Sequence, residues 1–400
     1  MIVIRSARLI DGVADEVRTD IDVVIERDRI ASVDHHDPEG SLPPDATVID
    51  GDGGTLLPGL IDCHAHYPID PSVEDGFLQF RHDPDTTIAL RAAGMARRAL
   101  EAGVTTARSA GSPATFDHVL RDAIEAGYVP GPRLLAAGPA LTITGGHGWL
   151  FGREADGEAE FVRAVRTNVR DGADVIKVVA SQAAMLAGAD NGAGGAEMTE
   201  GEIRASVDEA TRLGRRVLAH AQGGESVRRA ARSGVASVEH AFLAEEADLE
   251  VLAASGAVLV PTLVVTDVWR TIEGLSQASR ARQDLIERLH RRSCETAIRL
   301  GIPLATGTDC GVRGVMADMV AREVRLLHEH GASAMTAIRA ATSTAARLLG
   351  LETEIGTVAV GMRADLLLVE GDPLADLRCL ERVRAVVKAG AVIRPASAAG

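Results

Sequence analysis

The stretch RDGADVIKVV, residues 170–179, contains the pattern that decides the fold. A helix-like stretch ends at a glycine, which can adopt the left-handed conformation that closes a helix. A run of β-branched residues follows at once, and such a run is typical of a buried parallel strand. The pattern recurs in EAGVTTA (101–107), VPGPRLLAA (129–137), RLGRRVLAH (212–220), RSGVASVEH (232–240), ASGAVLVP (254–261) and RLGIPLATGTD (299–309). The sequence therefore predicts seven units in which a helix leads into a parallel strand.

One more apolar run, LLPGLIDCHAH (56–66), precedes these units without a helix before it. Eight parallel strands separated by helices are typical of a (β/α)8 barrel. A doubly wound open sheet alternates in a similar way, but the eight regular units and the polar residues at the strand ends favour the barrel. We therefore predict an α/β protein with a TIM barrel over residues 58–355.

The two ends of the chain have a different texture. Residues 1–57 and 356–400 read as short runs of alternating apolar and polar residues, as in MIVIRSARLID (1–11) and RVRAVVKAGAVIRP (382–395). Alternation with period two, interrupted by Gly, Asp and Pro turns, is typical of antiparallel sheet. We predict that both ends together form one small β-sandwich domain.

Composition narrows the class of protein. With 57 acidic and 42 basic residues the net charge is −15, which argues against binding to nucleic acid or to an anionic membrane. No signal peptide is recognisable at the N-terminus, and no apolar run approaches the ~18 residues of a membrane span. The cysteines lack CxxC spacing, which predicts reduced thiols in a cytoplasm: Cys63, Cys294, Cys310 and Cys379. We expect a cytoplasmic protein that acts on a small molecule.

Polar residues mark the carboxyl ends of the predicted strands, where barrel enzymes carry their reactive groups. His64 and His66 end the first strand, and their i, i+2 spacing aims both rings to the same side. The others, in chain order, are Lys177, His220, His240 and Asp309. A single histidine at a strand end is usually only a hydrogen-bonded side chain. Four of them meeting one aspartate predict a site for Zn²⁺ or a similar divalent ion.

Lys177 stands out because only it and Lys388 are lysines, whereas the other 40 basic residues are arginines. An ammonium among Val and Ile is strongly disfavoured, so its pKa should fall and the amine should become neutral. A neutral amine can react with CO₂ to give a carbamate, an anion that can bridge two metal ions. The alternative is an ammonium that reaches past the strand end to Asp174 or Asp309.

These residues carry a resemblance to the amidohydrolase superfamily. The matching motifs are PGLIDCHAH (58–66), VIKVV (175–179), HAQ (220–222), EHA (239–241) and GTD (307–309). More narrowly, TITGGHG (142–148) and the segment ATSTAARLLGLETEIGTVAVGMRADLLLVEGDPL (341–374) resemble the imidazolonepropionase-like branch. That branch includes metal-dependent dipeptidases of the Xaa-Pro type.

The resemblance implies two divalent metal ions per chain, with Zn²⁺ expected. One ion would be held by His64, His66 and Asp309, and the other by His220 and His240. A carbamate on Lys177, derived from CO₂, would bridge them. Relatives are commonly dimers or larger, so the resemblance also implies a homo-oligomer.

The resemblance further implies how these groups would act. A hydroxide shared by the two metals would be the nucleophile, its pKa lowered by the metal charge. Asp309 would act as general base and then deliver the proton to the leaving group. His147, in GGHG, would stabilise the oxyanion of the tetrahedral intermediate. The alternative for His147 is a capping role in a Gly-rich turn.

The residues around the substrate depart from that branch. Related dipeptidases often carry Tyr or His where Gln222 stands, and a Ser-Gly-Gly run where this chain reads ASQAAML (180–186). The candidate substrate-binding residues are Tyr67, Arg108, Gln222, Trp269 and Arg313. An arginine at a strand end could hold a substrate carboxylate with two hydrogen bonds, although most arginines are solvated or paired at the surface.

We therefore predict a binuclear metal-dependent hydrolase of an amide-type C–N bond, in a dipeptide or an N-acyl amino acid. One alternative is a cyclic-amide hydrolase or deaminase with a single metal and an unmodified Lys177. A carbamate, urea or ester substrate would need no change in the ligands. A catalytically silent scaffold is the third alternative.

Overall fold

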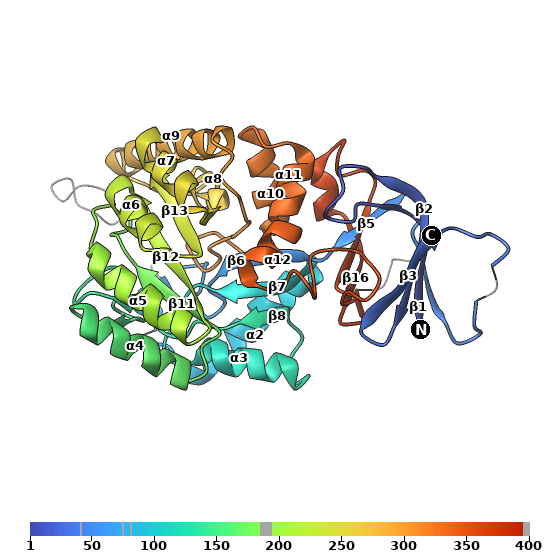
Figure 1. Cartoon of the computed structure of the whole chain (residues 1–400), viewed down its shortest axis with the longest axis horizontal. Helices are drawn as coiled ribbons and strands as arrows, with labels where there is room; N and C mark the ends of the chain where they lie inside the picture. The colour runs from blue at the N-terminus through green and yellow to red at the C-terminus, as the bar shows by residue number, and fades with distance from the viewer. Residues whose placement is uncertain (41, 74–75, 81, 185–193, 395–400) are drawn as a thin grey trace.

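A computed structural model of the chain describes residues 1–40, 42–73, 76–80, 82–184 and 194–394 (Figure 1). A larger part built of helices and parallel strands adjoins a sheet to which both ends of the chain contribute. In Figure 1 the blue N-terminal strands and the red C-terminal strands lie together at one end of the molecule. The last six residues of the predicted C-terminal segment lie outside the described residues.

The terminal sheet contains eight strands among the described residues, in the order β17-β16-β15-β5-β1-β2-β3, with β4 beside β1. β15 and β5 join the two chain ends, because Leu366 pairs antiparallel with Pro58. The described strands form one hydrogen-bonded sheet, so the predicted sandwich of two sheets is not confirmed. The bounds are β1 (Ile2–Leu9), β2 (Arg18–Glu26), β3 (Arg29–His35), β4 (Thr47–Asp50), β5 (Gly54–Pro58), β15 (Leu366–Glu370), β16 (Val383–Lys388) and β17 (Ala391–Arg394).

The larger part contains two parallel sheets in the described chain, one ordered β10-β9-β11-β12-β13-β14 and one ordered β6-β7-β8. This confirms the predicted α/β class with parallel strands, and each of the first seven predicted runs contains a strand. The bounds are β6 (Leu60–Ala65), β7 (Val104–Ser109), β8 (Arg133–Leu135), β9 (Leu141–Thr142), β10 (Arg153–Glu154), β11 (Val175–Val179), β12 (Arg216–Gly223), β13 (Ser237–Leu243) and β14 (Val258–Val260).

Helices surround these parallel strands (Figure 1). Many helices end at a glycine, as the repeated pattern predicts; Gly256, for example, closes α7 with a φ of 74°. The bounds are α1 (Gly76–Gln79), α2 (Asp85–Glu101), α3 (Phe116–Glu125), α4 (Glu158–Arg170), α5 (Glu200–Arg212), α6 (Gly224–Arg232), α7 (Glu246–Ser255), α8 (Leu263–Trp269), α9 (Gln277–Arg299), α10 (Val320–Glu329), α11 (Ala334–Ala340), α12 (Ser343–Leu349) and the 3₁₀ helix η1 (Leu377–Glu381).

The eighth predicted strand is the exception. Residues 300–309, all of them described, contain no strand, only an isolated bridge from Leu304 to Leu259. Pro303 has no N–H to donate. The N–H of Thr306 donates to the carbonyl of Ala340 at the end of α11 (3.0 Å), so it does not pair with a neighbouring strand. The ladder is therefore interrupted, and the described strands do not form one closed eight-stranded sheet.

Backbone hydrogen bonds nevertheless link the two parallel sheets. The N–H of Asp174 donates to the carbonyl of Ala136, which follows β8, at 2.8 Å. On the other side, the N–H of Cys63 in β6 donates to the carbonyl of Thr306 at 2.8 Å. The segment that contains Thr306 bonds in turn to β14, because the N–H of Ala305 donates to the carbonyl of Leu259 at 3.0 Å, so hydrogen bonds bridge both gaps between the sheets.

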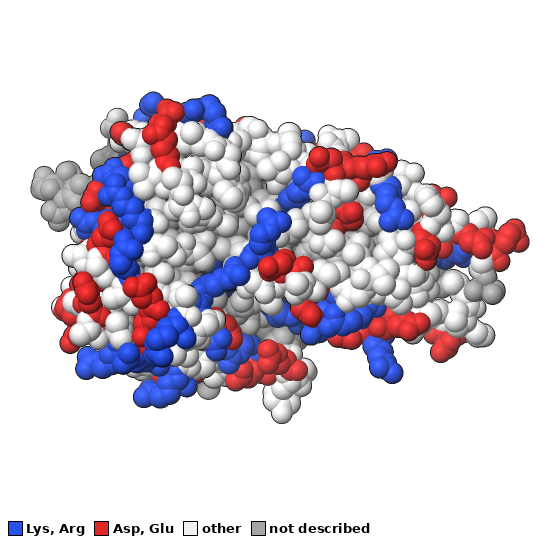
Figure 2. Space-filling model, in the orientation of Figure 1, with Lys and Arg blue, Asp and Glu red and all other residues white. Residues whose placement is uncertain are grey.

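Figure 2 shows acidic and basic side chains on the same face of the molecule. In the part of the chain that the structure describes, no helix combines the length and the apolar character needed to cross a membrane.

Candidate metal centre

His64 in β6, His66 directly after this strand and Asp309 meet at the carboxyl ends of the strands. His64 Nε2 lies 3.3 Å from Asp309 Oδ1, and His66 Nε2 lies 3.4 Å from the same oxygen. One ligand atom from each of the three residues lies within 4.8 Å of the other two. Among the described residues these are the ones that meet closely enough to hold a metal ion together. We refer to them as the HxH cluster.

Local backbone geometry explains why Asp309 reaches β6. A side chain at Gly307 would place its Cβ 2.6 Å from the Cβ of His64, so only glycine allows this close approach. Two residues later the N–H of Asp309 donates to the carbonyl of His64 at 2.7 Å. The GTD motif thus holds the aspartate against the first histidine.

Each histidine of the HxH cluster is oriented by an acceptor behind it. The Nδ1 of His64 lies 2.7 Å from the carboxylate of Glu239, and the Nδ1 of His66 lies 2.8 Å from the carbonyl of Gly111. A carboxylate and a carbonyl can only accept, so each Nδ1 carries the proton. The lone pair of each Nε2 therefore faces Asp309, as in metal-binding histidines backed by an acceptor.

His220 on β12, His240 on β13 and Lys177 on β11 form a second group beside the cluster. The ring of His240 lies 4.8 Å from that of His64 and 4.6 Å from that of His220. The Nδ1 of His240 contacts the hydroxyl of Thr262 at 2.8 Å, and a hydroxyl can either donate or accept. The Nε2 of His220 is buried and has no hydrogen-bond partner among the described residues.

Lys177 is 3 % exposed inside β11. Burial lowers the pKa of its amine to about 8, against the attraction of Glu239 and Asp309 for the charged form. Asp174, one of the two carboxylates considered as its partner, instead pairs with Arg121 at 2.7 Å. Burial thus makes the neutral amine of Lys177 more accessible at pH 7 than it is in an exposed lysine.

The protonation states of the histidines and the aspartate at the site favour binding of a cation. Burial lowers the pKa of His66, and lowers those of His220 and His240 well below the usual value, so these rings are neutral. Burial raises the pKa of Asp309, but His64 and the other neighbours hold it well below its usual value. Neutral imidazoles around an ionised carboxylate, with one buried ring nitrogen unpartnered, fit a divalent metal ion.

Four residues at or next to the site have a strained backbone. The φ angles of His240, Ala241, Thr262 and Asp309 are 77°, 49°, 56° and 56°. Residues other than glycine rarely adopt such angles, and strained residues of this kind cluster at functional sites.

His147 lies beside the second group, with its ring 4.7 Å from that of His220. Its backbone N–H donates to the carboxylate of Glu197 at 3.0 Å. Burial, and then the charge of Lys177, lower the pKa of the ring to about 4, so it is neutral at ordinary pH. The structure therefore brings His147 to the edge of the predicted metal ligands.

Two of the five candidate substrate residues, Arg108 and Gln222, make hydrogen bonds within the protein. Arg108 is 2 % exposed, and its guanidinium bonds to the carbonyl of Cys63, the hydroxyl of Ser237 and the carboxylate of Glu239. These bonds direct its guanidinium toward Glu239, and a bond from it to a substrate carboxylate stays a prediction. Gln222 is also engaged, because its Oε1 accepts from the N–H of Ala184 at 2.6 Å.

The other three candidates differ in burial. Tyr67 is 2 % exposed, and its hydroxyl has no hydrogen-bond partner among the described residues. Trp269 ends α8 and contacts Phe242 edge to face, with the ring centroids 6.2 Å apart. Arg313 is half-buried in the segment after Asp309. Trp269 also packs against the core, and substrate contact by any of these three residues stays a prediction.

Sequence reasoning missed the residues behind the ligands, chiefly Glu239 and Thr262. Glu239 is fully buried; burial raises its pKa, but Arg108 and the bond to His64 lower it to about 2. A signal was available, because Glu239 is an acidic residue inside an apolar strand, as Lys177 is a basic one. No such signal marks Thr262.

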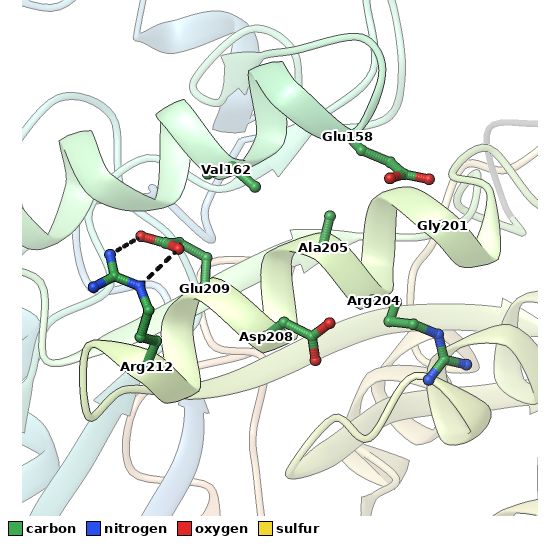
Figure 3. A pocket seen from close by; sticks show the side chains of 8 residues that line it. All are labelled: Glu158, Val162, Gly201, Arg204, Ala205, Asp208, Glu209 and Arg212. Carbon is green, nitrogen blue, oxygen red and sulfur yellow. Dashed lines mark hydrogen bonds and ion pairs between the residues drawn. The ribbon is translucent and has the colours of Figure 1, made fainter.

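A surface pocket between α4 and α5 is separate from the metal centre (Figure 3). Figure 3 shows Glu209 and Arg212 paired at one end of it. The pocket shares no residue with the ligands described above; its lining residues are Glu158, Val162, Gly201, Arg204, Ala205, Asp208, Glu209 and Arg212.

Comparisons with known proteins give matches over most of the chain. The Amidohydrolase family matches residues 55–393. Ochratoxinase of Aspergillus niger is 31% identical over 363 residues, which cover 83% of this chain and 73% of the relative. Imidazolonepropionase of Salinispora arenicola is 27% identical over 382 residues, 88% of this chain and 86% of the relative. A solved Xaa-Pro dipeptidase with methionine bound in its active site has a TM-score of 0.88 and 29% identity, covering 98% of this chain and 99% of that one.

Proposed function

Because the chain belongs to the amidohydrolase family, whose members include hydrolases of C–N bonds, we propose that it hydrolyses the amide bond of a dipeptide or an N-acyl amino acid with the help of bound metal ions. The observation that carries the proposal is the HxH cluster, where two oriented histidines face one ionised aspartate.

Two ions fit the side chains present. His64, His66 and Asp309 would hold the first ion. The unpartnered Nε2 of His220, the ring of His240 and a carbamate on Lys177 would hold the second. We expect zinc, because three or four neutral imidazoles with a carboxylate suit it. When bound, the ions would supply Lewis-acid activation of water and of the substrate carbonyl.

Lys177 would enter the site through a covalent change. Its neutral amine attacks CO₂, a new N–C bond forms, and the proton of the amine passes to solvent. The cation is thereby replaced by an anion with two oxygen atoms. The low exposure of Lys177 and the pKa of about 8 support this step, because an unperturbed lysine holds almost no neutral amine at pH 7.

Asp309 would transfer the proton, and His147 would stabilise the negative charge that develops on the substrate oxygen. The carboxylate of Asp309 accepts the proton that the attacking water loses and then delivers it to the leaving nitrogen. The neutral ring of His147 donates an N–H to the oxygen on which negative charge develops. Tyr67 and Arg313 would line the substrate beside them.

The choice of an amide rests on the relatives. One solved neighbour is a Xaa-Pro dipeptidase and one relative is an ochratoxinase. Both resemble this chain over most of its length, so a substrate with an amide bond next to an amino acid is the first choice. The hydrogen-bonded position of Gln222 distinguishes this chain from dipeptidases with Tyr or His there, and leaves the acyl part of the substrate open.

A mononuclear cyclic-amide hydrolase is the second candidate. The observation that favours it is that His64, His66 and Asp309 meet closely, whereas among the described residues His220 and His240 are not grouped with them. The similarity to imidazolonepropionase agrees with this alternative. In that case Lys177 stays unmodified.

The finer architecture is also a proposal. We infer a closed (β/α)8 barrel over residues 58–355 and a β-sandwich domain from residues 1–57 and 356–400. The hydrogen bond from Ala305 N–H to the carbonyl of Leu259 (3.0 Å) and that from Cys63 to Thr306 support closure through the eighth segment. A homo-oligomer in the cytoplasm stays a prediction.

The test is hydrolysis by metal-free protein before and after addition of Zn²⁺ and bicarbonate. The panel contains Xaa-Pro dipeptides, N-acyl amino acids, a cyclic amide, and an ester and a carbamate of the same acids. Zn²⁺-dependent cleavage of the first two classes supports the proposal. Cleavage of the cyclic amide alone supports the second candidate. A blank panel with Zn²⁺ bound contradicts both and favours a scaffold.

A further inference from the structure

A buried ion pair lies directly behind the HxH cluster. Arg108 on β7 and Glu239 on β13 are 2 % and 0 % exposed. Their closest atoms, Arg108 Nη2 and Glu239 Oε1, are 3.0 Å apart. The other carboxylate oxygen lies 2.7 Å from the Nδ1 of His64. Arginine, glutamate and histidine thus form a continuous chain that ends at a proposed metal ligand.

We propose that Arg108 and Glu239 are a positioning pair that fixes His64 with its proton on Nδ1, and so presents the Nε2 lone pair to a metal ion. This inference rests on the proposed function, since it needs a metal at the HxH cluster. It assigns to Arg108 a role that differs from substrate binding.

The hydrogen bonds of Glu239 explain why one residue would not suffice. Its Oε1 accepts from the guanidinium of Arg108 and from the hydroxyl of Ser237, so Oε2 is left for His64. A carboxylate with one oxygen held by two donors cannot rotate away from the imidazole. The bond to His64 therefore has a fixed direction, which a lone buried carboxylate would lack.

The guanidinium of Arg108 is held just as firmly. Its Nε donates to the carbonyl of Cys63 at 2.6 Å, one residue before His64, and its Nη1 donates to Ser237 Oγ at 3.1 Å. One planar group thus connects the backbone of β6 with side chains of β13. A lysine could not make these three bonds at once, because its ammonium lacks the planar fork.

The experiment measures Zn²⁺ affinity by competition with a chromophoric chelator, on the metal-free full chain and without substrate. The variants are Arg108→Met, Glu239→Gln and the double variant. We expect each single variant to bind the tighter ion about 10–100-fold more weakly. Because Arg108 acts through Glu239, the double variant should bind no more weakly than Glu239→Gln alone.

A second readout separates positioning from a structural effect. In ¹⁵N-histidine-labelled, metal-free protein, the signals of His64 should report a proton on Nδ1 in the wild type and a mixture of tautomers in Glu239→Gln. The matched control is Arg133→Met, which removes a different ion pair, with the largely buried Asp365. It should lower the melting temperature and leave both the Zn²⁺ affinity and the His64 tautomer unchanged.

The outcomes distinguish this inference from the proposed function. If the unmodified chain binds no Zn²⁺, the proposed function fails. If it binds Zn²⁺ and Arg108→Met binds it equally well, or if the effects of the two single variants add, the positioning role is wrong. Should Arg108→Met not fold, Arg108→Lys decides in its place, with weaker Zn²⁺ binding expected and wild-type binding contradicting the proposal.

Discussion

The two halves of the proposed metal centre, the HxH cluster and the group of His220, His240 and Lys177, differ in how the protein supports them. In the HxH cluster each histidine has a pure acceptor behind it, Glu239 or the carbonyl of Gly111, and both Nε2 atoms face Asp309. In the second group His240 is backed by a hydroxyl, and the Nε2 of His220 has no partner among the described residues. The first half is therefore formed by hydrogen bonds within the protein. The second half is completed only by what binds there, so we expect it to be the weaker site.

The largest effect is expected at Asp309, which faces both halves. Asp309→Asn removes the proton acceptor and a ligand, so kcat should fall by about 10²–10⁴-fold. Steady-state kinetics of the Zn²⁺-loaded variant measures this loss. Asp174→Asn, which removes a carboxylate paired with Arg121, is the matched control and should keep nearly full activity. An Asp309→Asn enzyme that retains about a tenth or more of kcat would refute its role as general base.

The next largest effect is expected at Lys177, where a substitution should affect the second group of ligands and leave the HxH cluster intact. Lys177→Ala should lose most activity, because the bridging carbamate is gone, and should keep one ion at the HxH cluster. A short carboxylic acid added to the buffer should restore part of the activity, whereas Lys177→Arg should not be rescued by its retained charge. Rates with and without formate, together with metal content, check this.

The chain supplies a matched control for Lys177. Lys388 is the other lysine, and its amine donates to the carbonyl of Gly131 away from the metal centre. Lys388→Ala should bind metal and turn over substrate like the wild type. Full activity in Lys177→Ala would remove the lysine from the site altogether.

A smaller effect is expected from the hydroxyl behind His240. Thr262→Val keeps the shape of the side chain and removes the hydroxyl, so the affinity of the more weakly bound ion should fall by roughly 10-fold. The tighter ion should be unaffected, in contrast to Glu239→Gln. Competition titration of Zn²⁺ resolves the two. Equal weakening of both ions would mean that the halves are not supported independently.

The smallest effect on the metal centre is expected at His290. Its ring contacts Phe242, and Phe242 in turn contacts His240. Burial lowers the pKa of His290 to about 3, from 6.5, so the unfolded chain binds the proton more readily over that interval. The free energy of unfolding should therefore decrease as the pH falls below 6.5. Between pH 7 and pH 5 the loss from this one group is roughly 2 kcal/mol.

The matched variant for this pH effect is His290→Asn, which removes the titrating ring. Denaturant unfolding at the two pH values should show a shallower pH dependence in the variant, with two metals still bound. The same pH dependence in both proteins would show that the His290 ring does not become charged on unfolding.

The parts of the fold that could be predicted are those that local chemistry decides. Glycine followed by a β-branched run marks a helix end and a buried strand, and this pattern found β7, β8, β11, β12, β13 and β14, but not the short strands β9 and β10. The eighth segment failed because Pro303 and the bond from Thr306 to Ala340 interrupt its ladder. Whether the terminal strands stack as two sheets depends on long-range pairing, which alternation does not encode.

The candidate site likewise has residues that local sequence predicts and residues whose role depends on distant partners. His64, His66 and Asp309 could be found because polar residues at strand ends are conspicuous in an apolar context. Arg108 lies in an equally conspicuous place, but the structure turns its guanidinium toward Glu239. The direction of a side chain at a strand end depends on its partners on other strands, here on the other parallel sheet, and one sequence does not reveal them.

The measurement that tests the central claim most directly is the metal content per chain, determined by elemental analysis of protein purified without chelator and in the presence of bicarbonate. The account predicts two divalent ions in the wild type and one in Lys177→Ala. One ion in the wild type would contradict the bridged centre and favour the mononuclear alternative. No ion, even after reconstitution with Zn²⁺, would contradict a metal-dependent hydrolase.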